Sequence, residues 1–167
     1  STVVSDSGVL LSNWSAAGNA QISTAQSKFG GSSLYFDGTG GDYVTPTADS
    51  SNFAFGTGDF TIEMWIRPTA FLADRTLIDF RPSGQNGAYV LINMSNSANG
   101  APYVLVNSSI VINGTGLTAD TWVHIALCRS GTSTKFFIGG TQVGSTWTDT
   151  TNYLSTANRP IIGKAFA

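Results

Sequence analysis

Charged residues are scarce in this sequence of 167 residues. They make up 11% of the chain, whereas 41% of the residues are hydrophobic; an average soluble domain has about 25% charged residues. Eight Lys and Arg residues and ten Asp and Glu residues give a formal net charge of -2. The basic residues are scattered and form no stripe that could neutralise a row of phosphates. Nucleic acid and anionic membranes are therefore not expected as partners.

Cysteine and long hydrophobic runs are equally sparse. The one cysteine, Cys128, cannot form an internal disulfide, and its place in the apolar run V-H-I-A-L-C predicts a small buried side chain instead of a reactive thiol. No apolar run reaches the ~18 residues of a membrane helix, and a signal peptide is not expected within these residues. Serine, threonine, asparagine and glycine fill most of the remainder, so the surface is predicted to be polar but largely uncharged.

Short segments with a hydrophobic period of two recur along the chain, and helical periods do not. They predict strands at residues 33–37, 60–67, 77–80, 88–93, 102–107, 110–113, 122–129, 134–138 and 160–162. Turn residues separate them, and Gly139-Gly140 suits a tight primed hairpin turn. The polar segment 146–153 is interpreted as a strand edge or an ordered loop. This spacing predicts one all-β domain, an antiparallel sandwich or barrel with almost no helix.

Four stretches carry a resemblance to a known family. They are K-F-G-G-S-S-L-Y-F-D-G-T-G-G-D-Y-V at 28–44, G-D-F-T-I-E-M-W-I-R-P at 58–68, D-T-W-V-H-I-A-L-C-R-S-G at 120–131 and K-F-F-I-G-G-T-Q-V-G at 135–144. In this order they resemble the laminin-G-like jelly rolls of the concanavalin A-like lectin and glucanase superfamily. The stretch at 19–34 is similar to the version found in bacteriophage virion and tail-associated proteins. The resemblance implies two stacked antiparallel sheets and recognition instead of catalysis.

The same resemblance bears on the two ends of the domain, which we expect to span residues 1–167. Members usually begin with an apolar strand ahead of the region that matches 1–23 and end with another after the region that matches 161–167. In the family fold these two strands lie side by side. We therefore expect a fragment of a longer chain, or ends that are not traced. The open sheet edge would be completed by the same polypeptide, another virion protein or a neighbouring subunit.

The segment 60–67 alternates between two chemically different faces. One face is apolar and is predicted to pack between the sheets: Phe60, Ile62, Met64 and Ile66. The other is predicted to form the outer surface or to lie under a loop: Thr61, Glu63, Trp65 and Arg67. The strand is therefore interpreted as scaffold.

Glu63 is the only glutamate, and glycoside hydrolysis needs two carboxyl groups. Asp59, the nearest acid on the same face, lies four residues away, or roughly 13 Å along a strand. Retaining enzymes need ~5 Å between the carboxyl groups and inverting ones up to ~9.5 Å. We expect no catalytic residue, and a cross-strand contact between Glu63 and an Arg or Lys. His124, the only histidine, has neither the partners of a triad nor further zinc ligands and is predicted to be structural.

Calcium is the metal that the resemblance implies. Many relatives bind it at the rim of the sandwich with Asp side chains and loop carbonyls, which suits a hard cation. Asp42 and Asp37, in the run D-G-T-G-G-D, are the candidates, and Asp59 is a third. The alternative is that this run is hairpin-turn chemistry, and we prefer that interpretation. No cofactor is expected to be required, and any calcium would bind weakly.

A carbohydrate site needs a flat aromatic ring beside amide and hydroxyl groups. The candidates are Trp147, Asn152, Tyr153 and Asn96. For Trp147 the alternative is a half-buried strand residue, which we place slightly ahead of a ligand platform. Trp65 and Trp122 lie in predicted strands and are expected to pack.

Two functions from different classes follow. The first is a non-catalytic structural or adhesive module of a phage virion, such as a capsid decoration, fibre or tail-associated protein, that touches host surface glycans. The second is a carbohydrate-binding module of a secreted bacterial protein. Either function predicts an extracellular or virion-surface location, and a homo-oligomer is compatible with both.

Overall fold

The computed structural model describes residues 3–4, 13–39, 41–47, 51–71, 74–83, 85–156 and 158–165. These residues are almost entirely β-structure. The strands are β1 (Val3–Val4), β2 (Trp14–Ala17), β3 (Gln21–Ser23), β4 (Ser33–Tyr35), β5 (Tyr43–Pro46), β6 (Phe60–Ile66), β7 (Arg75–Asp79), β8 (Val90–Met94), β9 (Pro102–Val106), β10 (Ser109–Asn113), β11 (Val123–Ser130), β12 (Ser133–Ile138), β13 (Thr141–Thr148) and β14 (Ile161–Ile162). The one helical element in the described ranges is a 3₁₀ turn, η1 (Ser51–Phe53). No helix in these ranges has the length and hydrophobicity of a membrane span.

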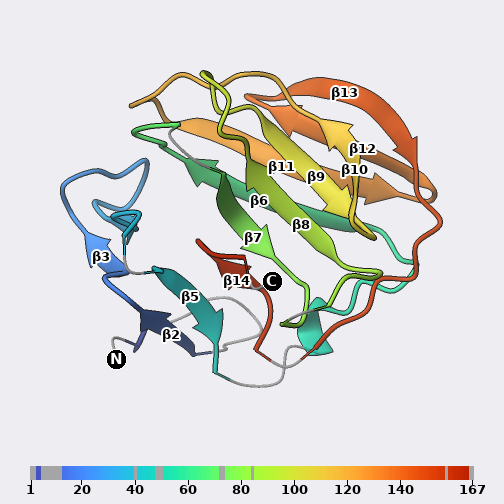
Figure 1. Ribbon diagram of the computed structural model, residues 1–167, viewed down its shortest axis with the longest axis horizontal. Helices are drawn as coiled ribbons and strands as arrows, with labels where there is room; N and C mark the ends of the chain where they lie inside the picture. The colour runs from blue at the N-terminus through green and yellow to red at the C-terminus, as the bar shows by residue number, and fades with distance from the viewer. Residues whose placement is uncertain are drawn as a thin grey trace.

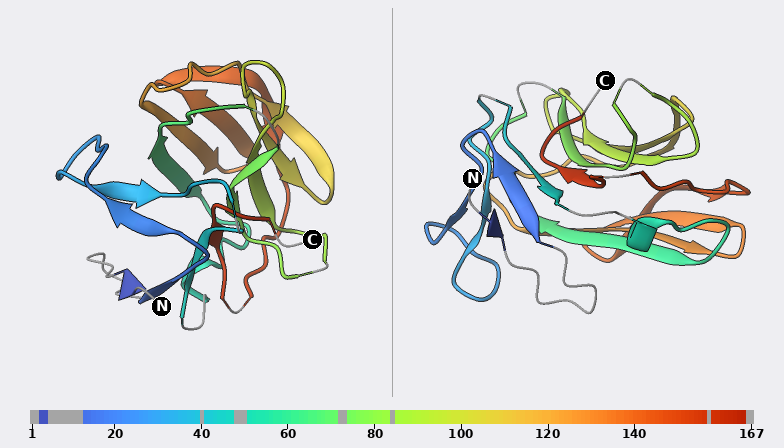
Figure 2. Two further views of the ribbon diagram at one scale, coloured as in Figure 1. Left: turned by 60° about the vertical axis from the view of Figure 1, so that its left-hand side comes forward. Right: turned by 90° about the horizontal axis from the view of Figure 1, so that it is seen from below.

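The strands form two main sheets and a small ribbon (Figure 1). The larger sheet has the order β1-β2-β5-β14-β7-β8-β9-β10, and the smaller has the order β13-β12-β11-β6. Strands β3 and β4 pair with each other outside both sheets. In Figure 1 the strands β7, β8 and β9, coloured from green to yellow, lie in front of β6 and β11, and Figure 2 shows the same layers from two other sides. The predicted two-sheet jelly-roll sandwich is confirmed.

The core lies between the two sheets. Ile92 and Val104 of the larger sheet and Leu127 and Phe136 of the smaller sheet are among its fully buried side chains. Burying each such side chain stabilises the fold by about 1.5–3 kcal/mol. The predicted alternation along β6 is confirmed, because its even-numbered residues pack in or against the core and its odd-numbered residues 61, 63 and 65 are exposed.

All nine predicted strands are present, with ends shifted by one or two residues. The Gly139-Gly140 turn is also as predicted: both residues have positive φ (57° and 82°), as a primed hairpin turn between β12 and β13 requires. Strands β1, β2, β3, β5 and most of β13 were not predicted. Strand β13 lies at a sheet edge and exposes most of its side chains, so its residues do not alternate clearly. Its last residues, 146–148, form the predicted strand edge, and the loop follows.

A buried polar cluster lies where that loop leaves β13. The Asp149 side chain is fully buried, and its Oδ2 atom accepts hydrogen bonds from the hydroxyls of Thr134 (2.9 Å) and Tyr153 (3.0 Å). Its Oδ1 atom accepts one from the N–H of Thr151 (3.0 Å). Arg129, 4% exposed on β11, places its Nε atom 3.9 Å from Oδ2 of Asp149. The carboxylate is thus surrounded by donors and a positive charge.

The remaining donors of this cluster are also satisfied. Arg129 donates from Nε to the carbonyl of Gly131 (3.0 Å), from Nη1 to that of Thr151 (2.8 Å) and from Nη2 to that of Asp149 (3.0 Å). Burial, and after it the negative charge of Asp149, raise the pKa of Tyr153, so its phenol stays protonated and remains a donor. The cluster therefore holds the chain at 149–153 in one conformation.

We predict that Asp149→Ala lowers the free energy of unfolding by about 3–5 kcal/mol, because it leaves the buried Arg129 guanidinium without its counter-charge. The control is Asp120→Asn, because Asn tolerates the left-handed backbone of residue 120 (φ 58°). Asp120 pairs with Arg67 at 2.9 Å but its side chain is 63% exposed, so this change should cost only about 0–1 kcal/mol. Urea unfolding of both variants measures the difference. Equal losses in the two variants would contradict the role given to the buried cluster.

Candidate functional site

The outer face of the smaller sheet gathers aromatic and charged side chains. Strands β6 and β11 lie side by side (Figure 1). Their antiparallel register places Trp65 opposite His124 and Glu63 opposite Ala126. The Trp65 and His124 rings lie 5.4 Å apart between centroids and are tilted by 43°. Ala126, between the larger neighbours Glu63 and Phe137, is only 7% exposed. Alternation along both strands thus directs these side chains away from the core.

The carboxylate of Glu63 contacts the imidazole of His124, and the expectation of an Arg or Lys partner is wrong. Oε2 of Glu63 lies 3.2 Å from Nε2 of His124, a diagonal neighbour across the strand pair. Arg67, the basic residue on the same strand face, pairs with Asp120 instead. Proximity across the sheet therefore decides which residue Glu63 contacts. His124 gains a polar contact that could not be predicted from its neighbours in the sequence.

Trp65 lies on the outward face of β6, as predicted, but it is more exposed than the expectation that it packs implies. Its side chain is 40% exposed, and Phe29, 68% exposed, approaches it edge-on at 5.8 Å between ring centroids. The Nζ atom of Lys28 lies 4.3 Å from the Trp65 ring centroid, within the range of a cation–π contact. We call the group Lys28, Phe29, Glu63, Trp65 and His124 the Trp65 patch.

A glycine pair shapes the loop that brings Lys28 and Phe29 to this patch. Both residues belong to the connection between β3 and β4, and Gly30 and Gly31 follow directly. Gly30 and Gly31 have φ values of 67° and 79°, which residues with a Cβ atom rarely adopt. The K-F-G-G sequence therefore allows a tight turn that carries an aromatic ring and an ammonium group onto Trp65.

Cys128 lies on the same outer face, opposite Thr61 of β6 and Lys135 of β12. It is partly exposed, so the prediction of a buried side chain is wrong. The run V-H-I-A-L-C is apolar, but the strand alternates, and Cys128 falls on the outward side with His124 and Ala126.

The predicted glycan residues do not come together as a single site. Trp147 is half-buried on β13 and packs against the core, opposite the buried Thr134. Tyr153 lies in the core: it is 3% exposed and its ring meets Phe60 edge-on at 5.5 Å between centroids. It therefore offers no free ring face to a sugar.

The two asparagines of that set are exposed but belong to different parts of the sandwich. Asn152 lies in the loop after β13. Asn96 lies in the connection between β8 and β9 of the larger sheet, where its backbone N–H donates to Oδ1 of Asp74 (2.9 Å). Both side chains are accessible to a ligand, and their role in glycan binding stays a prediction.

Two of the three calcium candidates do lie together. Asp42 is buried, and it accepts hydrogen bonds from the backbone N–H groups of Asn19 (2.6 Å) and Asp37 (2.9 Å). Asp37 accepts bonds from the hydroxyl and the N–H of Thr39 (both 2.7 Å) and from the side-chain amide of Asn19 (3.0 Å). These are the bonds of an ordered turn.

These bonds occupy oxygens that a calcium ion would need, since it takes six to eight oxygen ligands. Asp59 is engaged elsewhere, because its Oδ1 atom accepts a hydrogen bond from the N–H of Gly131 (2.7 Å). In the part of the chain that the structure describes, no three acidic, histidine or cysteine side chains are grouped as a metal site would require. The turn geometry fits the interpretation that we preferred, and calcium binding stays a prediction.

Sequence comparison identifies the family. Residues 37–167 match the concanavalin A-like lectin/glucanases superfamily. The chain belongs to this superfamily. The resemblance carried by the four sequence stretches is thereby confirmed. No curated protein sequence matches the chain.

Solved structures of this superfamily fold are similar to the chain at low sequence identity. Domain 4 of an extracellular arabinanase from Geobacillus stearothermophilus, solved with arabinotriose, is 12% identical with a TM-score of 0.60, over 89% of this chain and 71% of that one. The binding domain of botulinum neurotoxin serotype G is 11% identical with a TM-score of 0.64, over 94% and 39%. A carbohydrate esterase from the Shiga toxin-encoding bacteriophage phi24B is 15% identical with a TM-score of 0.55, over 90% and 81%. At these identities the likeness shows the fold alone.

The hydrogen bonds to Asp37 generate a pH prediction. They lower its pKa from 3.8 to about 2, and the Thr39 hydroxyl has the largest effect, followed by the Thr39 N–H and the Asn19 side chain. A carboxyl group whose folded pKa is lowered stabilises the fold above its unfolded pKa, and loses this effect as the pH falls from 3.8 towards 2. NMR titration of the Asp37 carboxyl carbon should give a midpoint of about 2. Thr39→Ala should raise that midpoint towards 3.8, and the exposed control Thr118→Ala should not. A midpoint near 3.8 in the unmodified protein would contradict the turn geometry.

Proposed function

We propose that the chain is a non-catalytic glycan-binding module whose sugar ligand lies on the Trp65 patch. The observation that carries the proposal is the exposed Trp65 ring beside the Glu63–His124 pair. Membership of a superfamily of lectins and glucanases supports it.

The chemistry of the patch suits a sugar. An aromatic ring can cover the apolar C–H face of a pyranose, and burial of that face supplies most of the affinity. A carboxylate accepts hydrogen bonds from sugar hydroxyls, and an imidazole N–H donates them. The two groups lie on adjacent paired strands, so their spacing is held by the sheet. The Lys28 ammonium group lies over the Trp65 ring and Phe29 meets this ring edge-on, so a sugar would use the remaining exposed part of the ring or displace Lys28.

A binding role suits the carboxylates better than hydrolysis does. Glu63 is the only glutamate, and its carboxylate contacts the imidazole of His124. Asp59, roughly 13 Å away along the strand, accepts a backbone hydrogen bond from Gly131. That separation exceeds the ~9.5 Å limit for an inverting glycosidase, so the pair supports recognition of a sugar without its cleavage.

Two settings outside the cell are compatible with this role. In the first, the chain is an adhesive or structural module of a phage particle, such as a capsid decoration, a fibre or a tail-associated protein, that touches host surface glycans. In the second, it is a carbohydrate-binding module of a secreted bacterial protein. The low charge and the Ser- and Thr-rich composition suit both settings. The N-terminal stretch at 19–34, similar to phage virion proteins, favours the first.

The edge of the smaller sheet could serve assembly in either setting. Strand β6 is an edge strand whose one partner, among the described residues, is β11. An edge of seven residues can accept a further strand through its backbone groups. Other virion proteins, another part of the same polypeptide, or a second copy of the chain are the partners that we propose for it.

The test is a glycan-array screen of the purified chain, with and without calcium, on host-type polysaccharides. Trp65→Ala should weaken binding about tenfold or more, because it removes the ring that covers the sugar. Trp147→Ala is the matched control, since Trp147 packs partly against the core. If Trp147→Ala abolishes binding and Trp65→Ala does not, the ligand lies on the loop after β13. Absence of binding to any glycan would favour a structural module whose partner is a protein.

A further inference from the structure

The ribbon of β3 and β4 stands apart from the two main sheets. In the part of the chain that the structure describes, these strands pair only with each other, and Figure 1 shows β3 beside the sandwich instead of within either layer. Ile22 of β3 and Tyr35 of β4 lie on opposite faces of the ribbon and are 48% and 46% exposed. The sandwich therefore covers neither face completely, and an isolated pair of strands is only marginally stable in water.

The base of the ribbon is held firmly. Asn19, just before β3, and Asp37, just after β4, each donate a backbone N–H to the buried carboxylate of Asp42, at 2.6 and 2.9 Å. Hydrogen bonds to a charged acceptor are roughly twice as strong as those between neutral groups. Asp42 therefore fixes both ends of the ribbon at the point where they join the sandwich.

The tip of the ribbon has its own internal hydrogen bonds. The Ser33 hydroxyl donates to the carbonyl of Gln26 (2.8 Å), and the N–H of Ala25 donates to the Ser23 hydroxyl (3.2 Å). All four residues belong to the ribbon or to its connecting loop, so these bonds order the tip without tying it to either sheet. The tip can therefore move as one unit about its base.

The tip contacts the sandwich at Trp65. The Nζ atom of Lys28 lies 4.3 Å from the centroid of the Trp65 ring, and the Phe29 ring meets it edge-on at 5.8 Å between centroids. Phe29 remains 68% exposed, so this contact buries little apolar surface. A cation–π contact at an exposed site changes an equilibrium only about two- to fivefold. The tip is thus held more weakly than the base.

Lys28 occupies the place where a sugar would stack. A sugar binds an aromatic ring through the face of the ring, and the Lys28 ammonium group lies over that face of Trp65. Trp65 is fixed by the pairing of β6 with β11, whereas Lys28 is carried by the ribbon. A glycan that needs the whole ring face must therefore move Lys28, and only the weak contact at the tip opposes that movement.

We propose that the β3–β4 ribbon is a strap over the sugar site, and that Lys28 is its autoinhibitory contact. In the closed state the Lys28 ammonium group covers the Trp65 ring. In the open state the tip is lifted and a glycan takes its place. The apparent affinity for the glycan is then reduced according to the fraction of molecules that are closed. This inference rests on the proposed function and adds a regulatory element to that site.

The closed state can be measured by NMR without any glycan. Protons over the face of an aromatic ring are shifted upfield by its ring current. The Hε signals of Lys28 should therefore lie upfield of those of Lys135, an exposed lysine on β12, and Trp65→Ala should move them to the Lys135 position. Lys28 signals that are the same with and without the Trp65 ring would overturn the proposal.

Binding curves with the neutral host-type polysaccharides of the glycan array measure the inhibition. Lys28→Ala should strengthen binding about two- to fivefold, because it uncovers the ring. Lys28→Arg should not, because a guanidinium group also stacks on aromatic faces. The control Lys135→Ala removes the same charge from the same sheet, roughly 16 Å from Trp65 by the strand register, and should leave binding unchanged.

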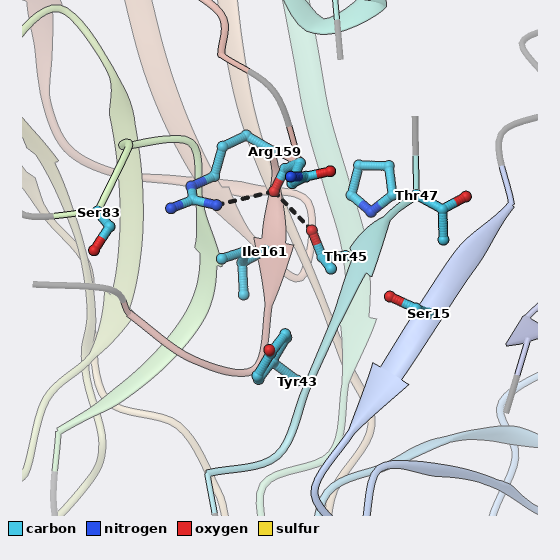
Figure 3. A pocket seen from close by; sticks show the side chains of 9 residues that line it. Ser15, Tyr43, Thr45, Thr47, Ser83, Arg159 and Ile161 are labelled. Carbon is cyan, nitrogen blue, oxygen red and sulfur yellow. Dashed lines mark hydrogen bonds between the residues drawn. The ribbon is translucent and has the colours of Figure 1, made fainter. Parts of the chain in front are cut away.

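The strap and the proposed function fail in different ways. If Trp65→Ala weakens binding but Lys28→Ala leaves it unchanged or weakens it too, the strap is overturned and the proposed function stands. No binding by either the unmodified chain or Lys28→Ala would overturn both. So would binding that is lost in Ser15→Ala and kept in Trp65→Ala, because Ser15 lines a depression beside β2, β5 and β14 on the larger sheet (Figure 3).

Discussion

The buried carboxylate of Asp149 fixes the path of the chain as it leaves the smaller sheet towards the larger one. It accepts hydrogen bonds from three donors on β12 and on the segment after β13, and it lies beside Arg129 of β11. A buried charge of this kind is tolerated only if it is paired and fully hydrogen-bonded. Only a small range of donor positions can satisfy the Asp149 carboxylate. The cluster therefore restricts the chain to one path as it leaves the smaller sheet.

That path links the two layers of the sandwich. Beyond Asp149, Tyr153 exchanges backbone hydrogen bonds with Gly56, and the N–H of Leu154 donates to the carbonyl of Ala88 near the start of β8. The Tyr153 ring fills the core while its hydroxyl reaches Asp149. One residue thus serves the apolar packing and the polar cluster together. This double role explains why an aromatic side chain in a polar segment is buried.

A rigid inner face has consequences for the outer one. Arg129 and Leu127 point inward from β11, and His124 and Ala126 lie on its other side. Because backbone alternation couples the two faces, anchoring the inward residues also fixes where the outward ones stand. A binding surface built on such strands loses little conformational entropy when a ligand arrives. The proposed glycan surface around Trp65 would gain its order in this way from contacts on the opposite side of the sheet.

Sequence patterns predicted the fold well because the core strands alternate strongly. The face of β6 that packs inward could be read directly from Phe60 and Ile62, and the turn at Gly139-Gly140 from its glycines. Edge strands were harder, since β13 has few buried positions to generate a pattern. The predicted superfamily also followed from local motifs, whose order along the chain was more informative than any one of them.

The candidate site was less predictable, because it depends on contacts between distant segments. The partner of Glu63 is set by the register of β6 against β11. Trp65 stays 40% exposed although Lys28, Phe29 and His124, two of them from a distant loop, contact its ring. Nothing local to T-W-T-D-T-T-N-Y shows that Tyr153 turns inward to a carboxylate four residues away. The outward face of β6, with a carboxylate and a tryptophan on alternate positions, was the available signal, and it was interpreted as scaffold.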